Sequence, residues 1–184
     1  MAFLTLHQSN DLEARIARVE LLLLDVDGVL TDGSITYSDS HEEVKRFHVR
    51  DGTGLKLWME AGKKVAIVSG RTSPTVLRRA TELGIITVLQ GQENKLAALA
   101  EVLETFKLTA DQVCAMGDDL PDLPVMKTVG VAVAVADAVA EVRLAAHSVT
   151  IIPGGHGAVR ETVEWLLKRQ GHWDGLVSRF HPAG

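Results

Sequence analysis

The sequence predicts an α/β fold: a doubly wound, Rossmann-like parallel sheet with helices on both faces. Short apolar runs alternate along the chain with segments whose apolar residues recur at helical spacing, a pattern typical of strands joined by helices. Hydrophobic residues make up 46% of the 184 residues and charged residues 23%, which is the balance of a globular protein. A chain of this length can bury one substantial core, and no repeat or linker divides it. We therefore expect a single domain over residues 1–184.

Strands are expected where compact apolar runs are bounded by turn-forming or charged residues. In chain order they are residues 21–26, 64–68, 85–89, 113–116, 131–135 and 149–152. Because these strands alternate with helices, they should lie parallel, with their carboxyl ends at one edge of the sheet. Polar residues that follow the strands are then predicted to converge at that edge.

Helices are expected where apolar residues share one face and capping residues stand at the ends. In chain order they are residues 10–19, 54–61, 74–83, 93–106, 122–129, 139–145 and 158–170. Pro74 and Gly84 illustrate the pattern, since proline favours the first turn of a helix and glycine the position after its end. The end of the first helix, residues 17–20, leads into the core. Residues 171–184 show no period and are interpreted as a C-terminal tail.

Composition excludes several classes of function. The net charge is −5 and aromatic residues make up 4%, so neither a phosphate-backbone binder nor a base-stacking surface is expected. No apolar stretch reaches the length of a membrane helix, and residues 1–19 lack the apolar region of a signal peptide. Cys114 is the one cysteine, so we predict no disulfide framework. A cytoplasmic enzyme or module that binds neither nucleic acid nor membrane fits these observations.

Polar residues follow four of the predicted strands. They are Asp25 and Asp27, then Ser69 and Arg71, then Lys95, and finally Asp118, Asp119 and Asp122. Five acids at one edge would repel one another without a counter-ion, and Mg²⁺ suits a few carboxylates together with a substrate phosphate. A lysine and a hydroxyl suit phosphate oxygens. An aspartate can also act as a covalent nucleophile. The residues therefore predict phosphoryl transfer with Mg²⁺ as cofactor.

Turn-forming and apolar residues alternate over residues 31–47, which predicts a β-hairpin flap. This flap and the expected helices and strands fill the segments from Asp27 to Ser69 and from Ser69 to Lys95, so neither segment can hold a cap domain. Sites of phosphoryl transfer exclude bulk water during the reaction. The flap or a neighbouring subunit must therefore cover the site, and we expect a homo-oligomer.

Four ordered motifs resemble the signatures of the haloacid dehalogenase superfamily of phosphatases, in its capless subclass. They are residues 25–31 (Asp-Val-Asp-Gly-Val-Leu-Thr), 69–71 (Ser-Gly-Arg), Lys95 and 117–122 (Gly-Asp-Asp-Leu-Pro-Asp). Within that superfamily, residues 47–52, 91–95, 134–138 and 154–161 resemble phosphatases of keto-deoxy sugar acids. The resemblance extends over about residues 18–172.

The resemblance implies a role for each residue of the motifs. Asp25 attacks phosphorus and forms an aspartyl-phosphate, while Asp27 protonates the leaving sugar oxygen and then activates water. Asp25, Asp118 and the main-chain carbonyl of Asp27 bind Mg²⁺. Ser69 and Lys95 hold the phosphoryl group, and Lys95 also orients Asp25. The resemblance assigns supporting roles behind the metal ligands to Asp119 and Asp122.

The substrate implied by the resemblance is 3-deoxy-D-manno-octulosonate 8-phosphate, within lipopolysaccharide biosynthesis, and the implied assembly is a homotetramer whose tails reach neighbouring sites. Arg71 favours this eight-carbon substrate, because relatives that act on nine-carbon sugar acids carry glutamate there. His156 is a departure, since this loop often carries arginine or lysine. The residues expected to bind substrate are Asp27, His48, Val49, Arg50, Asp51, Gly52, Lys56, Ser69, Gly70, Arg71, Arg79 and Lys95.

Two alternatives remain open at this stage. The first is a phosphatase of a nine-carbon, sialic acid-type 9-phosphate. The second is a non-catalytic module, such as a phospho-acceptor receiver domain or a regulatory oligomerisation domain. A receiver carries adjacent acids on its first strand and its acceptor after a later strand, whereas here Asp25 and Asp27 follow the first strand and the pair Asp118 and Asp119 lies far downstream. This order favours the phosphatase.

Overall fold

The computed structural model describes residues 4–5, 10–39 and 43–180. A seven-stranded sheet with the order β1-β9-β8-β7-β2-β5-β6 forms its centre, and all neighbouring strands are parallel except β1 and β9. Its strands are β1 (Leu4–Thr5), β2 (Leu21–Leu24), β5 (Lys64–Val68), β6 (Thr87–Leu89), β7 (Val113–Gly117), β8 (Val131–Ala134) and β9 (Ser148–Val149). The α/β, Rossmann-like prediction is confirmed, and the antiparallel edge strand β1 was not predicted.

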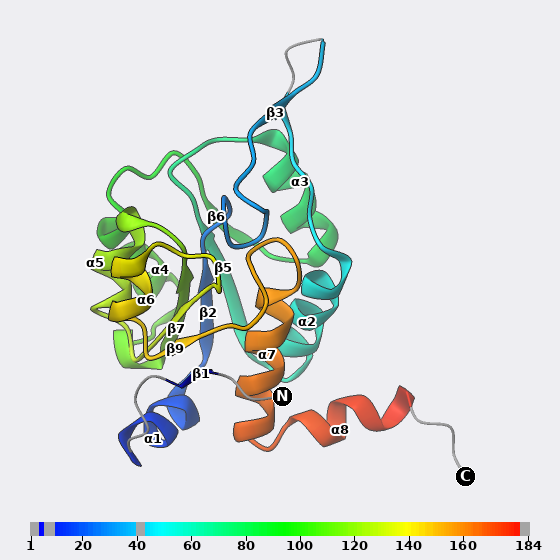
Figure 1. Ribbon diagram of the computed structural model, residues 1–184. Helices are drawn as coiled ribbons and strands as arrows, with labels where there is room; N and C mark the ends of the chain where they lie inside the picture. Colours follow the sequence, from blue (N-terminus) through cyan, green and yellow to red (C-terminus); the bar gives the residue numbers. More distant parts are fainter. Residues whose placement is uncertain (1–3, 6–9, 40–42, 181–184) are drawn as a thin grey trace.

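Helices cover both faces of this sheet (Figure 1). The group α4, α5 and α6 lies on one face, and α2 and α7 pack together on the other. The helices are α1 (Asn10–Arg18), α2 (Val49–Glu60), α3 (Pro74–Leu83), α4 (Lys95–Phe106), α5 (Leu123–Met126), α6 (Ala140–Ala145), α7 (Ala158–Arg169) and α8 (Trp173–Val177). Within the described ranges, no helix has both the length and the apolar character needed to cross a membrane.

Strand β2 runs through the middle of the core, between β5 and β7. Its four leucines are buried, and each contributes about 1.5–3 kcal/mol through loss of apolar surface to water. Leu24 pairs with Ile67 of β5 and with Met116 of β7, so the three strands end at nearly the same level. The chain order runs outward from β2 in both directions, through β5 to β6 and through β7 to β8. Ligands of such sheets bind at this reversal point.

The hairpin predicted over residues 31–47 is present but short. It consists of β3 (Thr36–Tyr37) and β4 (Glu43–Val44), paired antiparallel, and it stands beyond the carboxyl ends of the sheet strands (Figure 1). Residues 40–42, which include part of the expected turn, lie outside the described residues. No cap domain interrupts the described chain, so the flap is the element of this chain positioned above the sheet edge.

Several predicted boundaries were wrong. Helix α2 begins at Val49 rather than at residue 54, so Gly52 and Gly54 lie inside the helix. A Cβ at Gly54 would stand 3.2 Å from Arg160 Cα, so this glycine permits the close contact of α2 with α7. Residues 150–152 are not strand. In place of the one helix expected over residues 122–129, a 3₁₀ turn, η2 (Leu120–Asp122), leads into the short α5, which ends at Met126.

The C-terminal tail, in which the sequence showed no period, contains a short helix. Helix α8 is followed by a 3₁₀ turn, η3 (Ser178–Phe180), and residues 181–184 lie outside the described residues. The Trp173 ring has the Arg160 guanidinium 5.1 Å and the Lys168 ammonium 5.5 Å from its centroid. Arg179 forms two hydrogen bonds with Glu60, of 2.5 and 2.7 Å. The described tail therefore contacts α7 and α2 of its own chain.

Candidate active site

Four charged side chains meet where β2 and β7 end and α4 begins. Asp25 directly follows β2, and Lys95 is the first residue of α4 because Asn94 caps that helix. Lys95 Nζ lies 2.8 Å from Asp25 Oδ1 and 2.6 Å from Asp122 Oδ1. All three of these charged residues are buried. We call Asp25, Lys95, Asp118 and Asp122 the rim cluster.

Two glycines allow the carboxylates of the rim cluster to approach one another. Gly28 has φ 91°, and a Cβ there would stand 2.0 Å from Asp118 Oδ2. A Cβ at Gly117 would lie 2.5 Å from Asp122 Cβ. Asp122 Oδ2 accepts a hydrogen bond of 3.0 Å from the Asp118 amide, which fixes the turn after β7. This contact places Asp122 directly behind the Asp118 turn, and its supporting role stays a prediction.

Burial dominates the electrostatics of the rim cluster. It raises the pKa of Asp25 to about 6, with a further contribution from Asp122 and opposition from Lys95. Burial also raises the pKa of Asp118 to about 7, and the charges of Asp25 and Asp122 add to it. Burial alone would lower the pKa of Lys95, but the two carboxylates that it contacts raise it. The single positive charge of Lys95 therefore does not balance the three carboxylates of the rim cluster.

A divalent cation fits this deficit. One carboxylate oxygen each from Asp25, Asp118 and Asp122 lies within 4.8 Å of the others. Hard oxygen donors held this closely are the ligand type that Mg²⁺ prefers. The geometry is compatible with the expected metal-binding role of Asp25 and Asp118. The Asp27 side chain contacts Lys45 instead, and binding of the metal by the Asp27 main-chain carbonyl stays a prediction.

Ser69 stands on the neighbouring strand end. It follows β5, which pairs with β2, and its residue is 2% exposed. Its amide donates to the Leu89 carbonyl at 2.9 Å, and its hydroxyl oxygen accepts from the Arg71 amide at 3.2 Å. These bonds hold the Ser69–Gly70–Arg71 turn at the sheet edge beside Asp25, in the place expected for a hydroxyl that contacts phosphate.

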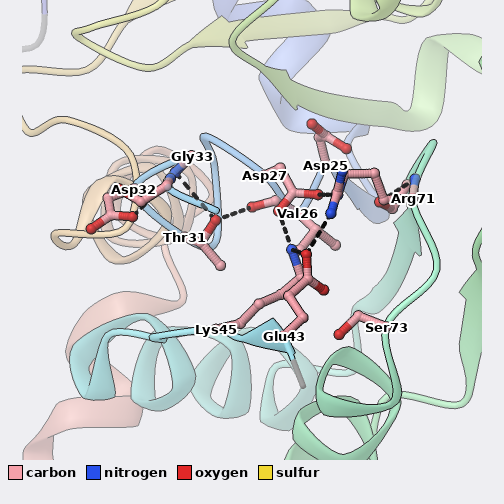
Figure 2. A network of polar contacts seen from close by, with 12 residues as sticks. Asp25, Val26, Asp27, Thr31, Asp32, Gly33, Glu43, Lys45, Arg71 and Ser73 are labelled. Carbon is pink, nitrogen blue, oxygen red and sulfur yellow. Dashed lines mark hydrogen bonds and ion pairs between the residues drawn. The ribbon is translucent and has the colours of Figure 1, made fainter. Parts of the chain in front are cut away.

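Asp27 points toward Lys45 of the flap and toward Arg71 (Figure 2). Its Oδ1 contacts Lys45 Nζ, and its Oδ2 lies 3.7 Å from Arg71 Nε. Glu43 Oε1 lies 3.5 Å from Lys45 Nζ and 2.5 Å from Arg71 Nη2. We call Asp27, Glu43, Lys45 and Arg71 the flap cluster. Sequence reasoning missed Glu43 of β4 and Lys45 just after it, although residues two apart in an extended chain point to one face.

Most of the other expected substrate residues lie in or next to α2 and α3. Asp51 is buried, its Oδ1 accepts from the Arg160 amide at 2.7 Å, and burial raises its pKa. Gly52 leaves space for Arg79, whose Nη2 would lie 2.3 Å from a Cβ there. Val49 is 77% exposed, and Arg50 and Lys56 are also exposed, while His48 is half-buried and Gly70 exposed. Arg79 pairs with Glu82 at 3.3 Å rather than with the rim cluster.

Two further sequence candidates have structural contacts. Asp119 is exposed and its Oδ1 accepts from the Leu120 amide at 2.8 Å, which starts η2. His156 Nδ1 lies 2.7 Å from the Gly154 carbonyl oxygen, within its own loop. That loop packs tightly against the turn after β2, since a Cβ at Gly154 would stand 1.7 Å from the Gly28 carbonyl oxygen. The loop therefore packs directly against the turn that carries Asp25 and Asp27.

A doubly wound sheet with an Asp-x-Asp turn, a buried lysine and distal carboxylates at its reversal point defines the class of haloacid dehalogenase-like hydrolases. The family model of that description matches residues 80–157. The 3-deoxy-D-manno-octulosonate 8-phosphate phosphatase of Escherichia coli K12 is 46% identical over 90% of this chain and 88% of its own. Within that class, the chain belongs to the family of 3-deoxy-D-manno-octulosonate 8-phosphate phosphatases.

Solved structures of the family agree. The phosphatase of this name from Yersinia pestis superposes with a TM-score of 0.88 at 44% identity, covering 90% of both chains. The one from Moraxella catarrhalis, solved in complex with a magnesium ion, a phosphate ion and KDO, has a TM-score of 0.92 at 37% identity and covers 95% of this chain and 100% of its own. The likeness therefore extends over nearly the whole chain rather than one motif.

Proposed function

We propose that this protein is a Mg²⁺-dependent phosphatase that converts 3-deoxy-D-manno-octulosonate 8-phosphate into 3-deoxy-D-manno-octulosonate and phosphate, in lipopolysaccharide biosynthesis. The contact of Lys95 Nζ with Asp25 Oδ1, at 2.8 Å, carries the proposal, because it orients a buried carboxylate as a nucleophile at the reversal point of the sheet. The 46% identity to the E. coli enzyme and the Moraxella complex with magnesium, phosphate and KDO support the choice of substrate and metal.

The reaction runs in two steps on this chain's residues. Asp25 attacks phosphorus, the bond from phosphorus to the sugar oxygen breaks, and that oxygen takes a proton from Asp27. Water then attacks the phosphorus of the aspartyl-phosphate, gives a proton to Asp27, and releases phosphate with Asp25 restored. Ser69 and Lys95 hold the oxygens of the group in transfer. One carboxyl as nucleophile and a second as proton carrier divide a difficult hydrolysis into two easier steps.

The metal would be held by the carboxylates of Asp25 and Asp118 together with the main-chain carbonyl of Asp27. When bound, Mg²⁺ neutralises negative charge on the phosphate and on the surrounding carboxylates. Asp122 keeps the Asp118 turn in place through the amide hydrogen bond of 3.0 Å. Asp119 supports the same turn from its exposed side.

Substrate recognition is assigned to cations outside the rim cluster. Arg71 is the best placed, because its side chain is 45% exposed and its Nε lies 3.7 Å from the Asp27 carboxylate. We assign it to the sugar acid and attribute to it the preference for an eight-carbon substrate. We assign the same role to residues of α2 and α3 and to the residue that caps α2. They are His48, Arg50, Asp51, Gly52, Lys56 and Arg79.

Assembly and location complete the proposal. The chain acts in the cytoplasm as a homotetramer, in which neighbouring subunits help to close sites that have no cap domain. Exposed apolar residues on and near the flap, such as Tyr37 at 64% and Val44 at 51%, support this arrangement. The last residues of the tail would then reach a neighbour's site, while α8 anchors the tail to its own chain.

A phosphate-release screen tests the proposed function. We expect phosphate from the eight-carbon 8-phosphate in the presence of Mg²⁺, a strong reduction with EDTA, and a lower kcat/KM for a nine-carbon sialic acid-type 9-phosphate. A preference for the 9-phosphate would reassign the substrate. Absence of phosphate release from every sugar acid phosphate would favour a non-catalytic module. The Asp11→Asn variant, with an exposed carboxylate changed, serves as the surface control.

A further inference from the structure

The flap buries a lysine against the proton-carrying aspartate. The Lys45 side chain is 2% exposed, although Val44 before it is 51% exposed and the Arg46 side chain after it is 76% exposed. Burying an ammonium without partners is costly. Lys45 meets this cost with two carboxylates, Asp27 and Glu43. A short exposed hairpin has little structural need for such a buried charge.

The flap cluster arranges its charges alternately. Asp27 lies between Lys45 and Arg71, and Glu43 lies between the same two cations on the other side (Figure 2). Hydrogen bonding by Arg71 and the charge of Lys45 lower the pKa of Glu43 even though burial opposes this. Glu43 therefore stays ionised as the second partner of Lys45. Each carboxylate is held from two sides, which restricts its rotation.

The backbone at Asp27 is already fixed by its own turn. The amides of Leu30 and Thr31 both donate to the Val26 carbonyl at 3.0 Å, and the Thr31 hydroxyl donates to it at 3.3 Å. What the turn leaves free is the rotation of the Asp27 side chain. A general acid must lie within hydrogen-bond reach of the oxygen that it protonates, so this rotation matters for catalysis.

We propose that Lys45 is a positioning residue for catalysis: its ammonium group fixes the rotation of the Asp27 carboxyl for proton transfer, and Glu43 holds Lys45 in place. The inference rests on the proposed role of Asp27 as the proton carrier. The flap thereby contributes to the reaction as well as covering the site. The rate of proton transfer would then depend both on how the substrate is bound and on where the flap lies.

Lys45 suits this role better than Arg71 does. Arg71 is 45% exposed, lies 3.7 Å from Asp27, and makes its shorter contact with Glu43 at 2.5 Å. Solvent screens contacts of so exposed a group. Arg71 can exchange Glu43 for a substrate carboxylate while Lys45 continues to hold Asp27. The two cations therefore divide substrate recognition and positioning between them.

The test compares two esters in the Lys45→Met variant. The alkoxide of a sugar acid phosphate needs a proton to leave, whereas the phenolate of p-nitrophenyl phosphate leaves without one. We expect the first step, measured by rapid mixing, to slow by about 10²-fold for the sugar acid phosphate and to stay near the wild-type rate for the aryl ester. The second step should slow for both esters, because water must give its proton to Asp27, so the aryl ester should show a burst.

Two controls isolate the contact with Asp27. Arg46→Met removes another flap cation, which pairs with Asp32 at 2.5 Å and does not touch Asp27, and should leave both rates unchanged. In a double-mutant cycle, Lys45→Met should add no further loss to Asp27→Asn, because contacting residues are not additive. Full additivity of the two losses would overturn the proposal.

A purely structural role of Lys45 has a different signature. If the lysine only anchored the flap, Lys45→Met would raise KM and slow the first step equally for both esters, and Arg46→Met would share part of the loss. Either result overturns the proposal. Failure of the proposed function gives a different result, because the wild-type enzyme would then release no phosphate from the sugar acid phosphate. The double-mutant cycle measured with p-nitrophenyl phosphate would still decide the role of Lys45.

Discussion

The rim cluster and the flap cluster both combine carboxylates with cations but are built differently. The rim cluster comes from the ends of core strands and the start of α4, and its lysine and carboxylates are mostly buried. The flap cluster joins the turn after β2 to a hairpin of two-residue strands, and Arg71 within it is half exposed. The proposed nucleophile, Asp25, is therefore positioned by the sheet, whereas the proposed proton carrier, Asp27, depends on an element outside the core.

Replacing the lysine of each cluster should show the largest difference between the two clusters, in both stability and turnover. Lys95→Met leaves Asp25 and Asp122 buried without their cation, so we expect the free energy of unfolding in EDTA to fall by about 3 kcal/mol. Turnover should fall by roughly 10³-fold, since a group that stabilises transferring charge is lost. Denaturant unfolding and steady-state kinetics measure these effects, with Lys127→Met at an exposed site as the control.

Lys45→Met should change the free energy of unfolding much less, because the hairpin packs outside the core. An equal destabilisation by the two lysine substitutions would contradict the distinction between a cluster built into the sheet and one completed by the flap.

A smaller effect concerns pH and Mg²⁺. Burial and neighbouring acids raise the pKa of Asp25 to about 6 and that of Asp118 to about 7. The stability that these raised values contribute is fully present below about pH 4 and is lost as pH rises through about 6 and 7. Mg²⁺ held by the ionised carboxylates, as proposed, would offset this loss. Thermal unfolding should therefore show a larger Mg²⁺-induced rise in Tm at about pH 8 than at about pH 5.

A rise in Tm of the same size at both pH values would contradict the assignment of the metal to these carboxylates. The flap cluster offers a matched comparison, because Glu43→Gln changes a carboxylate outside the rim cluster. That variant should keep the pH dependence of the Mg²⁺ effect.

The sequence predicted the rim cluster well for a physical reason. Parallel strands end at one edge, so residues that follow each strand, such as Asp25, Ser69 and Asp118, must meet there. The exact start of α4 was missed by two residues, because Asn94 serves as its cap rather than its second residue. The class of site did not depend on that boundary.

The features that prediction missed depend on contacts between distant segments. Lys45 becomes a partner of Asp27 only when the hairpin folds back over the sheet edge. Gly54 lies inside α2, where it permits close contact with Arg160 of α7. Glycine disfavours a helix when only the local sequence is considered, so the early start of α2 was not predicted. Helix α8 is too short to show a period and is held by Trp173 against α7. None of these contacts leaves a periodic signal in the sequence.

The central claim is that Asp25 becomes phosphorylated and Asp27 carries the proton. The most direct measurement is intact mass and peptide mapping of the Asp27→Asn variant after mixing with p-nitrophenyl phosphate and Mg²⁺. The aryl group leaves without a proton, and in Asp27→Asn the second step lacks its base. We therefore predict that phosphate accumulates on Asp25 in this variant. The double variant Asp25→Asn/Asp27→Asn should carry no phosphate. Stoichiometric release of nitrophenolate with no covalent phosphate, or with phosphate on another residue, would contradict the account.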